Sequence, residues 1–98
     1  MKDLICKAIQ DKKVISFTYK GYKRIVEPFT LGYLETTSNL TLSAWWIGGY
    51  SETNKSPHWR LYTISKISNI IIENIDSSTY HTGYNPRDSR MSSIICTV

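Results

Sequence analysis

Residues 14–27 read VISFTYKGYKRIVE, and this stretch decides the fold class. Apolar and polar side chains alternate over residues 14–19, which is the period of a half-buried β-strand. Lys20-Gly21 follows, and glycine tolerates the positive φ of a tight turn. A second strand over residues 22–27 is therefore expected to pair with the first as a hairpin.

More short strands are expected along the rest of the chain. Pro28 has no N–H, so it should end the second strand or place it at a sheet edge. Trp46 is in phase with the apolar side chains that precede it, which predicts a core position. The Gly-, Ser- and Asn-containing stretch over residues 48–58 predicts a loop. The remaining strands are expected over residues 29–33, 40–47, 59–64, 69–75 and 94–98.

Helices are expected at both ends of the chain. Asp3 can cap a short helix that ends near residues 11–13, with an apolar stripe on one side. Asn85-Pro86 has the form of an N-cap followed by proline at the first helical position, so a short helix should reach about Ser93. The pattern predicts a mainly β protein with flanking α, a small and strongly bent barrel with an N-terminal helix and a short C-terminal helix.

Length and composition fit a single domain over residues 1–98. The chain has 98 residues, a formal net charge of +4 and 20% charged residues, and this mild excess permits an anionic partner without requiring one. No apolar run approaches the length of a membrane span, and charges interrupt the first seven residues, so neither a membrane partner nor a secretory signal is expected. The two cysteines, Cys6 and Cys96, are predicted to be reduced and mostly buried, in a cytoplasmic protein.

Signals for catalysis, metal binding or a cofactor are missing from the sequence. There is no nucleophile elbow, no phosphate-cradling glycine loop and no His-Glu metal motif. The two histidines and two cysteines are too scattered for a zinc site. We expect a protein that is not an enzyme and holds no metal or cofactor.

Several segments in order resemble the WYL domain, a family named for a Trp-Tyr-Leu tripeptide. They are ISFTY from residue 15, RIVEP from 24, LTLSA from 40, WRLY from 59 and GYNPRD from 83. The tripeptide itself is replaced by Leu40-Thr41-Leu42, and Lys66 stands where the family pattern has a second arginine.

The resemblance implies a fold and a function. It implies an Sm-like, SH3-type β-barrel that senses a ligand, with a nucleotide or single-stranded nucleic acid as the expected partner. The family acts in bacterial transcription regulation, DNA-damage response and phage defence, usually joined to a DNA-binding winged helix. No attached domain of this kind is expected here, so a separate DNA-binding or effector protein is a further expected partner.

The resemblance also marks candidate ligand residues. Arg60 and Lys66 match the basic ligand positions of the family, and Arg24 on a neighbouring strand could add a third cation. Arginine offers a fixed fork of donors to phosphate, and Tyr62 could stack on a base. The alternative is a solvated strand face on which Arg60 pairs with Glu27 or Glu73.

Two tryptophans leave a second function open. Trp45 and Trp59 are expected to be partly exposed, as a stacking platform or at a subunit contact. His58, beside Trp59, is a weaker candidate for the ligand site. The chain could instead be a protein–protein interaction or oligomerisation adaptor that has lost ligand binding, with Trp45 or Trp59 and Tyr50 as anchors. Both hypotheses are compatible with a homo-oligomer.

Overall fold

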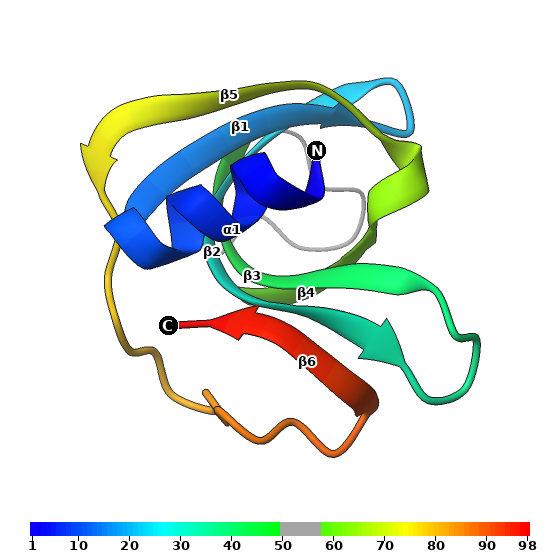
Figure 1. The fold of residues 1–98 in the computed structure, drawn as a ribbon. Helices are drawn as coiled ribbons and strands as arrows, with labels where there is room; N and C mark the ends of the chain where they lie inside the picture. The colour runs from blue at the N-terminus through cyan, green and yellow to red at the C-terminus, as the bar shows by residue number, and fades with distance from the viewer. Residues whose placement is uncertain (50–57) are drawn as a thin grey trace.

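The computed structural model describes residues 1–49 and 58–98, and it is mainly β (Figure 1). Its elements are α1 (Lys2–Asp11), β1 (Lys13–Tyr19), β2 (Tyr22–Leu34), β3 (Leu40–Gly49), β4 (His58–Thr63), the 3-10 turn η1 (Ile64–Lys66), β5 (Ile67–Asp76) and β6 (Met91–Thr97). The strands are antiparallel and follow the order β4-β3-β2-β1-β5, with β6 paired to β2. The expected hairpin is present, because β1 pairs with β2 from Tyr19–Tyr22 to Ile15–Val26.

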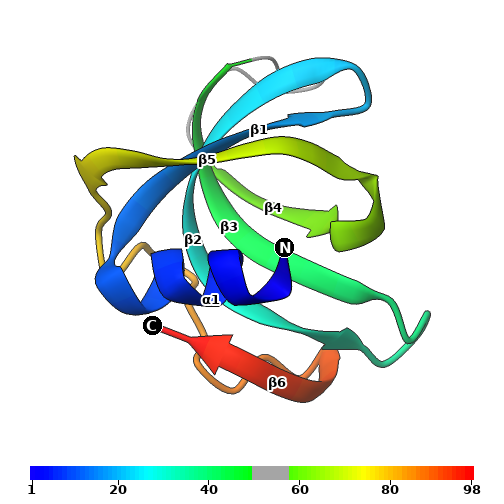
Figure 2. The same cartoon turned by 45° about the horizontal axis from the view of Figure 1, so that its top comes forward.

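The sheet curls but remains open among the described strands. No pairing joins its edge strands β4 and β5, so closure of the predicted barrel is not shown. Helix α1 lies across one end of the curled sheet, as two views show (Figure 1, Figure 2). Ile5, Ala8 and Ile9 of the helix are fully buried against the sheet, and the predicted apolar stripe therefore builds part of the core. No helix of the described residues is long and apolar enough to cross a membrane.

Strand β2 continues through Pro28, contrary to the expectation that the proline would end it or lie at an edge. Before Pro28 the strand pairs with β1, and from Thr30 onward it pairs with β6. Pro28 lies between these two ladders and beside a register shift against β3. At this position the missing N–H interrupts neither ladder, so one long strand can serve both partners.

The predicted C-terminal helix is wrong. Residues 77–90, here called the crossover segment, contain only turns and irregular backbone before β6 begins at Met91. The Asn85 side chain accepts a hydrogen bond from the backbone N–H of Arg87, and Asp88 does the same for Arg90. Each side chain thus closes a local turn two residues on, which competes with helix formation.

The prediction of two reduced cysteines is also wrong. Cys6 of α1 and Cys96 of β6 form a disulfide, with Cα atoms 5.8 Å apart, and both residues are half-buried rather than buried. The bond forms because α1 packs beside β6, an arrangement that neither local sequence reveals.

Candidate functional site

Two of the predicted ligand residues lie in the core. Arg24 is 1% exposed, and its Nη2 donates to the backbone carbonyl of Tyr19 at 3.2 Å. It is the cross-strand neighbour of the buried Phe17, so its side chain points inward. Tyr62 is fully buried, with ring centroids 5.0 Å from both Phe17 and Tyr19. Burial raises the pKa of the Tyr62 phenol, against the opposing charges of Arg60 and Arg24.

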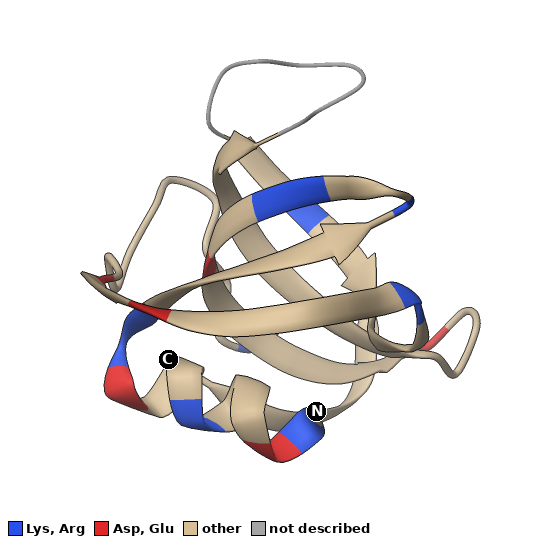
Figure 3. Cartoon of the chain, turned by 90° about the horizontal axis from the view of Figure 1, so that it is seen from above, with Lys and Arg blue, Asp and Glu red and all other residues tan. Residues whose placement is uncertain are grey.

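The expected basic strand face is not assembled. Arg60 is half-buried in β4, whereas Lys66 is exposed in η1, where the chain turns away from the extended path of β4. Lys and Arg positions are spread over the helix, the hairpin and several strands rather than gathered in one stripe (Figure 3). Glu27 and Glu73, the alternative partners of Arg60, bond to other groups.

Trp46 is a core residue, 4% exposed, as its phase predicted. Trp45 and Trp59 are half-buried, as expected, and belong to an aromatic cluster on the opposite face of β3 and β4. The members of the aromatic cluster are Phe29, Trp45, Trp59, His81 and Tyr84. Tyr50, the third proposed anchor, lies outside the described residues.

The crossover segment covers this cluster and is tied to it by side chains. The His81 ring stacks on Trp45, with centroids 4.1 Å apart and planes 5° apart. Trp59 Nε1 donates to the Thr82 carbonyl at 2.8 Å, and the Tyr84 hydroxyl donates to the Val98 carbonyl at 3.0 Å. A segment without regular secondary structure is thereby held on the sheet.

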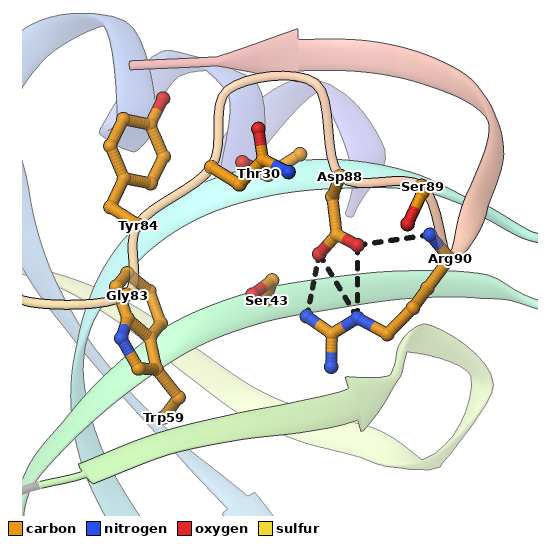
Figure 4. A pocket seen from close by; sticks show the side chains of 9 residues that line it. Thr30, Ser43, Trp59, Gly83, Tyr84, Asp88, Ser89 and Arg90 are labelled. Carbon is orange, nitrogen blue, oxygen red and sulfur yellow. Dashed lines mark hydrogen bonds and ion pairs between the residues drawn. The ribbon is translucent and has the colours of Figure 1, made fainter.

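A pocket of about 370 Å³ lies between the crossover segment and strands β2, β3 and β4 (Figure 4). Trp59 and Tyr84 form one end of the pocket, and the Asp88–Arg90 pair forms the other. The lining residues are Thr30, Ser43, Trp59, Gly83, Tyr84, Asn85, Asp88, Ser89 and Arg90. A smaller hollow of about 60 Å³ is lined by Ser43, Trp59, Arg60, Leu61 and Arg90.

The Asp88–Arg90 pair fixes a guanidinium in the larger pocket. Arg90 Nε donates to both carboxylate oxygens of Asp88, at 2.9 and 3.2 Å, and Nη2 donates to Oδ2 at 2.5 Å. These bonds hold the pKa of Asp88 below its ordinary value and raise the pKa of Arg90. The pocket therefore keeps one full negative and one full positive charge at neutral pH.

Sequence reasoning identified Arg60 and Trp59 but missed Ser43, Tyr84 and Arg90. The only available signal was the spacing of Asn85, Asp88 and Arg90, which is typical of two successive side-chain turns. Within the described part of the chain, no group of three or more His, Cys, Asp or Glu could hold a metal ion. Compared with known proteins, the chain matches no family model, no curated protein and no solved structure.

Proposed function

We propose that the protein is a non-catalytic, WYL-type ligand-sensing or regulatory module that binds a nucleotide or single-stranded nucleic acid. The single observation that carries this proposal is the pocket of about 370 Å³ with two aromatic rings at one end and a fixed arginine at the other. Trp59 and Tyr84 offer π-faces to a base, and Arg90 offers donors to phosphate. The volume lies within the usual range for small-ligand sites, about 300–1,000 Å³.

The strand order supports the fold part of the proposal. Consecutive antiparallel strands, with β5 returning to pair with β1 after a 3-10 turn, are consistent with an Sm-like, SH3-type barrel. The proposed setting is bacterial transcription regulation, DNA-damage response or phage defence, beside a separate DNA-binding or effector protein. A cytoplasmic location belongs to the proposal, although the Cys6–Cys96 disulfide weighs against it, since reducing compartments keep most thiols unpaired.

Fluorescence anisotropy tests the binding proposal. Labelled single-stranded DNA, double-stranded DNA and single-stranded RNA are titrated at two salt concentrations with wild type and Arg60→Ala. Saturable binding to single strands that weakens with salt and in Arg60→Ala supports the proposal. Lys66→Ala is the matched control, because it removes one exposed cation outside both pockets. No binding at tens of micromolar, or equal losses for both variants, contradicts it.

A second candidate function, the oligomerisation adaptor, is favoured by one observation on β5. Ile71 and Ile75 are 57% and 58% exposed on this edge strand. Exposed apolar side chains beside an edge that no other described strand pairs with are features of a strand-pairing contact between copies. Light scattering with size-exclusion chromatography tests this function: an oligomer that becomes a monomer in Ile71→Lys supports it, and a monomeric wild type contradicts it.

A further inference from the structure

The two hollows share three lining residues, which makes them neighbouring parts of one site. Ser43, Trp59 and Arg90 border both, and Arg60 borders only the smaller one. The smaller hollow, about 60 Å³, has room for a compact group rather than for a ring system. It lies between two arginines, whereas the larger pocket carries the aromatic rings. The site is thus divided into a small cationic part and a larger aromatic part.

Ser43 provides a hydroxyl group that is available to a ligand in the small hollow. The residue is 6% exposed, and its hydroxyl has no hydrogen-bond partner among the described residues. Figure 4 shows this side chain on β3 within the pocket, between Trp59 and Arg90. Ser43 Oγ is not among the buried polar atoms that lack a partner, so the hydroxyl is open to the pocket and can donate to a ligand acceptor there.

The Arg90 guanidinium also has an N–H group that is available to the same ligand acceptor. Its Nε and Nη2 are bonded to Asp88, and within the described residues Nη1 has no partner. Asp88 holds the guanidinium in place, so little side-chain entropy remains to be lost when a ligand binds. Ser43 and Arg90 therefore present preset donors to one small anionic group.

We propose that Ser43, Arg60 and Arg90 form a subsite for one phosphodiester group, with the attached nucleoside against Trp59 and Tyr84. The inference rests on the proposed function and narrows its ligand to a nucleoside that carries a monoanionic phosphodiester. Such a group is supplied either by a linkage within a single strand or by a cyclic nucleotide. A terminal phosphate is the disfavoured alternative.

The charge of the lining decides between the two kinds of phosphate. Among the described residues around both hollows, Arg60 and Arg90 are positive and Asp88 is negative, which leaves one net positive charge. A phosphodiester carries one negative charge, whereas a terminal phosphate carries about −1.5 to −2 at pH 7. Among the described lining residues, no further cation would balance the second charge of a terminal phosphate, and that charge would face the ionised Asp88.

Calorimetric titration with three probes tests the inference. The probes are adenylyl-3′,5′-adenosine, 3′,5′-cyclic AMP and 5′-AMP, applied to the full chain at pH 7.5. We expect one or both phosphodiesters to bind about tenfold more tightly than 5′-AMP. Binding of the dinucleotide alone identifies a strand as the source, and binding of the cyclic nucleotide alone identifies a small messenger-type ligand. Binding of 5′-AMP at least as tight as that of the phosphodiesters overturns the inference but leaves the proposed function standing.

Substitutions locate the subsite. Arg90→Gln should weaken phosphodiester binding by roughly tenfold or more, the usual loss for one charge-assisted hydrogen bond. Arg87→Gln is the matched control, because Arg87 is exposed in the same segment and lines neither hollow. Asp88→Asn should shift the affinity ratio toward 5′-AMP by about fivefold, since one opposing charge at contact distance is removed.

A second variant, Ser43→Ala, tests the inference if Arg90→Gln folds poorly. Ser43→Ala leaves every charge in place and should still weaken phosphodiester binding severalfold with an unchanged melting temperature. Equal losses in Arg87→Gln and Arg90→Gln would contradict the subsite. Failure of all three probes and of longer single strands to bind would instead contradict the proposed function itself.

Discussion

His81 Nε2 lies 2.5 Å from Glu27 Oε1, and this contact joins the crossover segment to strand β2. The second carboxylate oxygen, Oε2, accepts a hydrogen bond from the backbone N–H of Ser78 at 2.6 Å. Glu27 is only 6% exposed, so its carboxylate is largely shielded from water and depends on these two bonds. One carboxylate therefore anchors the segment that forms a wall of the candidate site.

Replacing Glu27 with glutamine should destabilise the protein by about 1–3 kcal/mol, because the amide nitrogen cannot accept the bonds that the carboxylate accepts. Urea unfolding followed by tryptophan fluorescence measures the loss. Glu35→Gln is the control, since Glu35 is exposed and its side chain makes no hydrogen bond within the described residues. Equal unfolding free energies for the two variants would show that Glu27 is not an anchor.

Gly83→Ala should cost more stability than Gly21→Ala. Both glycines have positive φ, +92° and +81°, so both substitutions carry a backbone penalty of about 1–2 kcal/mol. A Cβ at Gly83 would also lie 3.2 Å from Trp59 Nε1, whereas one at Gly21 meets nothing within 4 Å. The difference between the two unfolding free energies isolates the contact with Trp59. A larger loss for Gly21→Ala would be evidence against close packing of the crossover segment on Trp59.

Removing the disulfide should lower the unfolding free energy by about 2–4 kcal/mol, because the bond closes a long loop in the unfolded chain. The double variant Cys6→Ser/Cys96→Ser can be compared with wild type in urea, with and without a reducing agent. A reducing agent should lower the stability of wild type and leave the double variant unchanged. Two free thiols per chain in a thiol assay of the oxidised, denatured wild type would contradict the pairing.

The contribution of Asp88 to stability should fade in acid. Its pKa is lowered in the folded protein by the bonds from Arg90, so the contribution is present above the ordinary carboxyl pKa of about 4. It is then lost as the pH falls through the lowered value. The stability difference between wild type and Asp88→Asn should therefore shrink between pH 5 and pH 2. A difference that stays constant over this range would assign the effect of the substitution to something other than charge.

High salt should also reduce the stability difference between wild type and Asp88→Asn. Salt screens the Asp88–Arg90 pair because Arg90 keeps 56% of its side-chain surface exposed. Arg87→Gln serves again as the control, with a pH profile parallel to that of wild type.

Local patterns predicted the approximate positions of the strands and of helix α1, because alternation and apolar spacing act over a few residues. The expected cap was wrong, since Asp3 lies within the first turn of α1 and makes no capping bond. The burial of Trp46 followed from the same phase rule. The burial of Arg24 was not predicted. Arginine rarely occupies an inward position of a strand, and it then needs hydrogen-bond partners that the alternation pattern does not reveal. The pairing of Cys6 with Cys96 and of Glu27 with His81 joins residues far apart in the chain. Such contacts depend on how the helix and the strands pack against one another. The placement of the crossover segment, which forms a wall of the candidate site, could therefore not be predicted.

The Cys6–Cys96 bond also changes how the protein would carry a mechanical load. The two residues are separated by 90 positions, and almost all of the chain lies between them. A pull applied to the chain ahead of Cys6 and after Cys96 passes directly through the covalent bond rather than through the hydrogen bonds of the sheet. The strands and the pocket between them stay outside the line of force, and only the short flanking stretches of α1 and β6 would be stretched.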